Sequence, residues 1–397
     1  MPTHHNKIGV ATATIIGMNA MIGAGIFSVP AALGSYVGPA GLLTYLFVII
    51  AVWFMGTSLA RLAYLYPQEG SFYTYAYQWG GHVAGLLTAG SYLIGLIIAM
   101  GLLTQMAGSY IHDFFPLVCS FSWGVIVLIS LVLFNIFGVT ISQIGQIILI
   151  ICTIAPIILT TLICLLHGSS SNLYPFFPYG MTNVLSATKA VIFGFFGFEC
   201  AASLFTIVDH PEKNVPRALR YSIVLVGILY TAFVGSIIYA VPASYFINPD
   251  LSLRTILENV LPGHTWLLTL IQISILSAIL GTIHSMIWSA STLLLAYLHK
   301  WKSPFIKNAF KHQWITNRNA IVAMGIAIVI PFAAIKSIGL FFSLTAIFLI
   351  SAFISAMITL LCNKKEWESG QNIKTILGLI TALVILYFSF EEVFFLS

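Results

Sequence analysis

Long apolar stretches recur along almost the whole chain and are separated by short polar gaps. A helix needs about 20 apolar residues to cross a hydrocarbon core of roughly 30 Å. The pattern therefore predicts an all-α membrane protein with about 11 transmembrane helices. These predicted spans cover residues 8–34, 39–62, 83–111, 118–137, 141–166, 185–207, 218–241, 265–298, 319–335, 337–361 and 375–395.

Composition supports the same class of protein. Of the 397 residues, 59% are hydrophobic and 7% are charged, whereas about a quarter of an ordinary soluble domain is charged. The longest polar connections, at 66–82, 242–264 and 299–318, are too short to build a soluble core. We therefore expect one transmembrane transporter domain over residues 1–397, acting within the bilayer.

The positions of the basic residues predict the orientation. If the N-terminus is cytoplasmic, then all of the 16 Lys and Arg except Lys189, Arg254 and Lys336 fall on the cytoplasmic side, which is the expected bias. We expect the protein to lie in the cell (inner) membrane. An odd number of spans then places the C-terminus on the external side. The 299–318 loop carries Lys and Arg but no acid, so we expect a topology anchor near anionic lipid and no nucleic-acid role.

Cysteine usage suggests neither a disulfide framework nor a metal site. The five cysteines are odd in number and scattered, and in apolar runs they behave as small hydrophobes. We expect no cofactor and no metal. The apolar run after the N-terminal MPTHHNK is too long for a signal peptide, so we expect the first helix to be retained.

Two predicted spans contain closely spaced glycines at mid-membrane. Gly23 and Gly25 interrupt GMNAMIGAGIFSVP, and Gly194 and Gly197 precede Glu199 in AVIFGFFGFECAASLF. Each glycine costs about 1 kcal/mol relative to alanine in a helix, so these are natural places to unwind. Interrupted helices at matching positions of two halves indicate a transporter binding site. The alternative is that the glycines only allow close helix packing.

An unwound segment exposes main-chain N–H and C=O groups, and the dipoles of the half-helices add to each. A zwitterion could satisfy both kinds of group. We expect a carboxylate to bind the amides around Gly23, Ala24, Gly25 and Ile26. We expect an ammonium to bind carbonyls near Ala20, Met21, Phe193 and Gly194. Phe196 and Gly197 complete the predicted substrate-binding set.

Ionisable groups within the membrane are functional candidates by default. Glu199 is the acidic residue predicted at mid-span, and His284 is the other titratable side chain at depth. Both are candidates for gating or proton coupling, and the alternative is that each only hydrogen-bonds nearby backbone. Phe198, like Phe193 and Phe196, is a candidate for an aromatic gate.

Four stretches resemble the amino acid-polyamine-organocation permeases: GAGIF, YPQEGSFYTYAYQWGG, GFFGFE and DHPEKNVPRAL. The resemblance implies a LeuT-like fold, a 5+5 inverted repeat with discontinuous helices 1 and 6. Its repeats would cover about 8–166 and 185–361, with an extra C-terminal helix at about 375–395.

The resemblance also implies site residues. Gly23, Ala24 and Gly25 would bind the substrate carboxylate, and Phe193, Phe196 and Glu199 would line or gate the site. Span five is most similar to that of the arginine/agmatine-type exchangers of the family, because Thr153 stands where some proton-coupled members place a lysine. Two departures concern the inner gate: Thr206 and Ile207 replace the acidic pair usual before DHPEKNVPRAL, and HKWKSPFIKNAFKH lacks the usual polar-glycine-proline pattern.

The leading hypothesis is a secondary active transporter, a permease or antiporter that moves amino acids by alternating access, with proton coupling or exchange. A polyamine or cationic amino-acid exchanger is the alternative. A channel would be expected to carry a filter-like repeat, which this sequence lacks. A membrane-embedded enzyme would need clustered His, Asp or Cys side chains, whereas those in this sequence are isolated. The expected partners are a small-molecule substrate and the lipid bilayer. The oligomeric state is left open.

Overall fold

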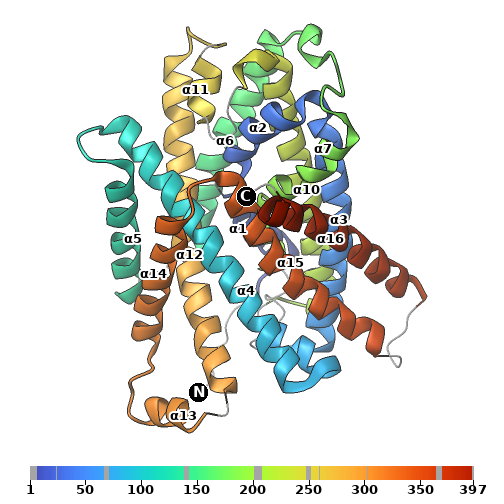
Figure 1. Cartoon of the computed structure of the whole chain (residues 1–397), viewed down its shortest axis with the longest axis vertical. Coiled ribbons are helices and arrows are strands. Elements are labelled where there is room, and N and C mark those ends of the chain that lie inside the picture. The colour runs from blue at the N-terminus through green and yellow to red at the C-terminus, as the bar shows by residue number, and fades with distance from the viewer. Residues whose placement is uncertain are drawn as a thin grey trace.

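The computed structural model describes residues 7–23, 25–66, 71–137, 143–200, 208–246, 252–258, 260–301, 303–363 and 369–395. Within these ranges the chain is helical, and its β-structure is one isolated bridge between Ile8 and Val208. Figure 1 shows the helices gathered into one elongated bundle. The all-α prediction is confirmed.

The first half of the chain supplies one group of helices: α1 (Val10–Met21), α2 (Gly25–Tyr36), α3 (Gly41–Leu65), α4 (Ser71–Phe114), α5 (Ser120–Ile136) and α6 (Gln143–His167). The second half supplies α7 (Gly180–Ser186), α8 (Thr188–Phe193), α10 (Pro211–Ala240), α11 (Leu253–Glu258), α12 (Thr265–Lys300), α13 (Pro304–Lys311), α14 (Asn317–Ala334), α15 (Ile338–Cys362) and α16 (Ser369–Phe395).

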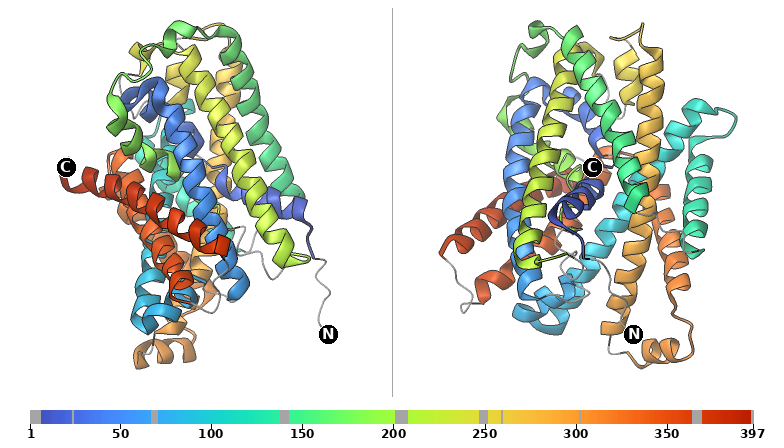
Figure 2. Two further views of the ribbon diagram at one scale, coloured as in Figure 1. Left: turned by 90° about the vertical axis from the view of Figure 1, so that its right-hand side faces the viewer. Right: turned by 180° about the vertical axis from the view of Figure 1, so that it is seen from behind.

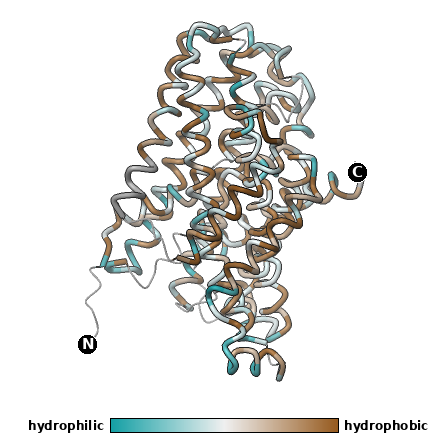
Figure 3. The backbone as a smooth tube through the Cα atoms, turned by 90° about the vertical axis from the view of Figure 1, so that its left-hand side faces the viewer, coloured by the Kyte–Doolittle hydropathy of each residue, from teal (hydrophilic) through white to brown (hydrophobic). Residues whose placement is uncertain are grey.

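Helix length and composition support a multi-pass membrane protein. In the described chain, seven helices are long and apolar enough to cross a bilayer by themselves. The α1–α2 pair adds a bent span, and α5 and the 151–167 part of α6 are shorter apolar helices. Figure 3 shows hydrophobic positions along the helices, with hydrophilic ones mostly towards the ends of the bundle.

Both predicted interruptions are present. α1 and α2 meet at an angle of 51° across the glycine pair. In the second half, α8 ends at Phe193, and 194–199 form turns in which Gly197 has a φ of 108°. A side chain is strained at such a positive φ, so glycine suits this break. Residues 201–207, the end of the predicted sixth span, lie outside the described ranges.

The third predicted span, 83–111, is part of a longer helical element. α4 is already helical at Ser71, and its direction changes at Gly81, whose φ is 68° and ψ is −159°. The segment before Gly81 carries polar and aromatic side chains, so the hydropathy pattern did not include it.

The C-terminal helix α16 crosses the outside of the bundle obliquely (Figure 2) and contacts α3, α7, α8 and α15. A polar cluster fixes its last turns. Lys189 Nζ of α8 lies 2.5 Å from Glu392 Oε2 of α16, and Ser343 Oγ of α15 donates to the same oxygen at 2.6 Å. The two charged side chains are 13% and 24% exposed. The ion pair therefore joins the extra helix to the half-helix before the second break.

This pair should contribute to stability. We expect Glu392→Gln to lower the apparent melting temperature, corresponding to about 1–3 kcal/mol, because a half-buried Lys189 ammonium loses its counter-ion. Removing both charges in Lys189→Met/Glu392→Met should recover part of that loss. Glu391→Gln is the matched control, since Glu391 forms no ion pair with a described residue. Equal effects of the two single glutamine variants would contradict this role.

Candidate functional site

A cavity of about 520 Å³ lies where the two broken helices meet. Its walls come from the last turns of α1, the α8 break, the middle of α4 and a long stretch of α12, with single side chains from α5, α6 and α15. The volume is in the range of small-molecule sites.

The two breaks touch each other through their main chains. A Cβ atom placed on Gly25 would lie 2.7 Å from Gly194 Cα, and one on Gly197 would lie 2.2 Å from the Ala20 carbonyl oxygen. These contacts leave no room for any side chain at either glycine. Glycine permits the positive φ at Gly197, and at both positions it permits the close approach of two segments that are far apart in the sequence.

The cavity is lined by most of the residues that the sequence predicted for the site: Ala20, Met21, Gly23, Gly25, Phe193, Phe196, Gly197, Glu199 and His284. Ile26, Gly194 and Phe198 do not line it. Ile26 and Phe198 are fully buried, and Gly194 packs against Gly25. Ala24 lies outside the described residues.

Hydrogen bonds around the first break determine which of its main-chain N–H and C=O groups remain free to bind another molecule. The Met21 carbonyl accepts from the Gly23 amide at 2.9 Å and from Tyr230 Oη at 2.9 Å. Both lone pairs of that oxygen are thus used. The Ile22 amide donates to Met18 at 2.7 Å. Tyr230, on α10, therefore holds the end of α1 in its unwound geometry.

Glu199 is 7% exposed at the cavity wall, and both carboxylate oxygens have donors. Tyr92 Oη of α4 donates to Oε1 at 2.8 Å, and the Gly197 amide donates to Oε2 at 3.0 Å. The glutamate thus pairs an amide left free by the break and ties the break to α4. Sequence reasoning missed Tyr92, because nothing in the pattern of α4 tells which way this ring faces.

His284 of α12 is bonded to a second polar side chain on the cavity wall. Asn135 Nδ2 of α5 lies 3.0 Å from His284 Nδ1 and donates to the Leu131 carbonyl at 2.9 Å. The same nitrogen donates to the His284 carbonyl at 3.3 Å. The amide nitrogen of Asn135 therefore faces His284 and can donate to Nδ1 whenever that ring nitrogen carries no hydrogen. Asn135 was missed, although an amide inside an apolar run was the available signal.

The aromatic side chains divide between the cavity and the core. Phe193 and Phe196 face each other edge to face, with centroids 6.3 Å apart. Phe198 instead packs against Phe353 of α15 at 5.3 Å. Phe193 and Phe196 are thus placed to contact a bound molecule, whereas Phe198 is buried on the side of the break that faces α15.

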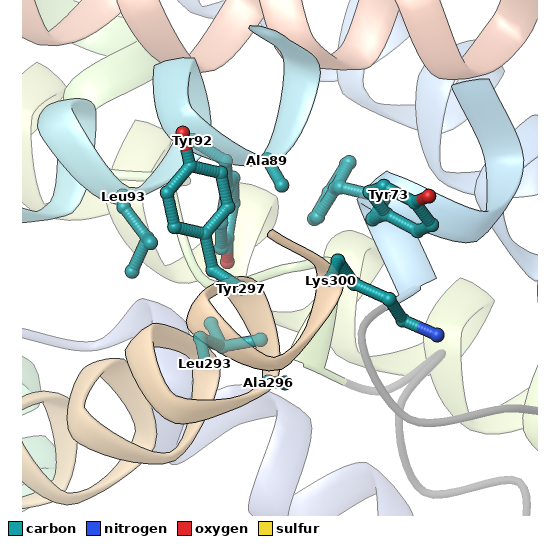
Figure 4. Close-up of a pocket in the computed structure, with 9 residues that line it drawn as sticks. Tyr73, Ala89, Tyr92, Leu93, Leu293, Ala296, Tyr297 and Lys300 are labelled. Atoms are coloured by element: carbon teal, nitrogen blue, oxygen red, sulfur yellow. The ribbon is translucent and has the colours of Figure 1, made fainter. Parts of the chain in front are cut away.

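The cavity extends from the breaks towards one end of the bundle. Its α12 wall runs from Ser277 to Ser289, in the direction of Lys300. Residues 26–33 of α2, on the other side of the break, are all buried. A second pocket, of about 20 Å³, shares Tyr92 with the cavity and lies nearer to Lys300, whose ammonium is 5.2 Å from the Tyr73 ring centroid (Figure 4).

The contact between the breaks can be tested by adding one methyl group. We expect Gly25→Ala and Gly197→Ala each to destabilise the protein by about 1–3 kcal/mol, because the new Cβ meets main-chain atoms that cannot rotate away. Gly9→Ala is the control, since nothing lies within 4 Å of its Cβ position. Thermal unfolding of the purified variants measures the effect. Unchanged stability in both site variants would contradict this geometry.

Sequence comparisons identify transporters. Residues 8–396 match the amino acid permease family. The branched-chain amino acid permease BcaP of Bacillus subtilis is 23% identical over 69% of this chain and 62% of its own length. The aromatic amino acid transport protein AroP of Escherichia coli O157:H7 is 24% identical over 73% and 66%. The matched part thus spans less than two thirds of these two relatives.

A further relative and a similar solved structure are also transporters. The methylthioribose transporter of Bacillus subtilis is 25% identical over 79% of this chain and 73% of its own length. A Na⁺-coupled sialic acid symporter, solved substrate-bound and outward-open, matches 97% of this chain and 90% of its own with a TM-score of 0.63 at 11% identity. That likeness shows the fold alone. Because the family match covers nearly the whole sequence, this chain belongs to the amino acid permease family.

Proposed function

We propose that this protein is a secondary transporter that carries amino acids across the cytoplasmic membrane by alternating access. The observation that supports this most is the meeting of two broken helices, through Gly25 and Gly194, at the wall of one cavity. Interrupted helices of this kind form the substrate sites of many transporters. Family membership agrees with this function.

The start of α2 is the proposed site for the substrate carboxylate. α2 begins at Gly25, and the first N–H groups of a helix have no partner within that helix, while its dipole favours an anion there. Gly25, together with Ala24, would supply the amides, because the Gly23 amide already donates to the Met21 carbonyl and Ile26 is buried away from the cavity lining. The ammonium would bind carbonyls of Ala20 and Phe193, because the Met21 carbonyl already has two donors and Gly194 packs against Gly25 away from the cavity lining.

The walls beyond this point favour a neutral side chain. Leu96, Ala99 and Leu103 of α4 and Leu349 of α15 line the cavity, with Phe193 and Phe196 near the breaks. Glu199, which accepts from Tyr92 and the Gly197 amide, is the one acidic side chain among the described residues that line the cavity, so a substrate with two cationic groups would lack a second acidic partner there. An apolar or aromatic amino acid is therefore the proposed substrate class, and the names of two relatives point to such substrates.

The proposed orientation has the N-terminus in the cytoplasm and the C-terminus outside, and the proposed repeats are 8–166 and 185–361 within one domain. In that orientation the cavity extends towards the cytoplasm. Coupling would be to protons or to a second amino acid, with Glu199 and His284 as the proton-accepting candidates.

A ligand screen tests the substrate class. We expect leucine, isoleucine, phenylalanine or tryptophan to raise the melting temperature of the purified protein, because a ligand that binds only the folded state stabilises it. Arginine and putrescine should not. The same ligands should drive counterflow in proteoliposomes, which a channel would not do. Stabilisation by amines alone would instead support the cationic alternative.

The carboxylate position is tested by Gly25→Leu. We expect loss of ligand-induced stabilisation and of uptake, because the new side chain collides with Gly194 and forces the start of α2 away from the second break. Gel filtration and membrane yield show whether the variant still folds and inserts. Full uptake by the variant would contradict the proposed carboxylate site.

Glu199→Gln tests proton coupling. Glutamine retains the shape and an acceptor for Tyr92 but cannot exchange a proton, so we expect uptake to lose much of its pH dependence. Tyr92→Phe is the comparison, since it removes the hydrogen bond and retains the acid. A pH profile of Glu199→Gln that matches the wild type would mean that Glu199 only pairs the Gly197 amide.

A further inference from the structure

The loop between α12 and α14 folds into a short helix that crosses the foot of the bundle. α13 runs from Pro304 to Lys311, and Figure 1 shows it crosswise to α12 and α14. Its inward side is apolar: Ala309 is 4% exposed, and the Phe310 ring stacks on His299 at 3.8 Å. α13 is therefore docked against the end of a membrane-spanning helix.

The outward side of α13 combines cations with exposed aromatic rings. Pro304, Lys307, Asn308 and Lys311 lie along two turns of the helix and line a shallow hollow together with Phe305. Phe305 is 72% exposed, and Trp314, just beyond the helix, is 64% exposed. Exposing two such large apolar side chains to water is unfavourable, whereas aromatic side chains are enriched at the membrane–water interface.

The charge on this surface is uncompensated. Neither Lys307 nor Lys311 forms an ion pair with a described residue, and residues 299–318 contain no Asp or Glu. The side chains of Lys307 and Lys311 project from adjacent turns of one helix face, so both can reach the same anionic layer. The partner that fits is negatively charged and lies beside an apolar phase.

We propose that α13 with Trp314 is an interfacial binding surface for anionic phospholipid headgroups of the surrounding bilayer. Lys307 and Lys311 bind the headgroup phosphates, while Phe305 and Trp314 enter the acyl boundary beside them. The bilayer is the source of the phosphate because α12 and α14, which flank α13, are both apolar spans. This inference is independent of the substrate.

The experiment uses the full-length protein in non-ionic detergent micelles, titrated in parallel with brominated phosphatidylglycerol and brominated phosphatidylcholine, which quench nearby tryptophan. Trp314→Phe gives the background from the other tryptophans. We expect Trp314 to be quenched by brominated phosphatidylglycerol at a lower mole fraction than by brominated phosphatidylcholine. Each of Lys307→Gln and Lys311→Gln should raise the half-maximal fraction about fivefold.

Lys213→Gln is the matched control, an exposed lysine in the first turn of α10 beside Glu212, and it should leave the titration unchanged. Gel filtration confirms that each variant is folded, and higher salt should weaken the effect in the wild type. Equal quenching by the two lipids would overturn the proposal. Competition by inorganic phosphate at the same concentration would also overturn it, since the site would then bind a free anion.

Discussion

Main-chain N–H and C=O groups cannot be left without partners at the centre of a bilayer, because no water is available there. A helix that breaks at this depth must find other partners for the freed groups. In this protein the two breaks lie against each other, and Tyr230, Glu199 and the start of α2 surround them. The geometry of the cavity follows from that requirement.

The partners of the breaks come from helices on different sides of the cavity. Tyr230 of α10 fixes the Met21 carbonyl, and Tyr92 of α4 fixes Glu199, which in turn holds the Gly197 amide. Each break is thereby connected to a continuous helix. A movement of α4 or α10 relative to the breaks would change these bonds, so the polar contacts that satisfy the backbone are also suited to transmit a conformational change.

Charged side chains are used sparingly and mostly at the margins of the bundle. Lys189 and Glu392 neutralise each other between α8 and α16, whereas Lys307 and Lys311 remain without described counter-ions on α13. The difference has a physical reason. A half-buried charge needs a partner within the protein, but a charge at the interface can be compensated by anionic headgroups.

The sequence alone determined the class of protein, the positions of most spans and the location of both breaks, because hydropathy and glycine placement depend on local chemistry. It also identified Glu199 and His284 as the polar groups at depth. Only the tertiary structure decided that Phe196 faces the cavity while Phe198 packs on Phe353, and that Tyr92 and Asn135 meet those two groups. These choices depend on the rotation of each helix about its own axis, which packing against neighbouring helices sets and which a uniformly apolar sequence does not encode.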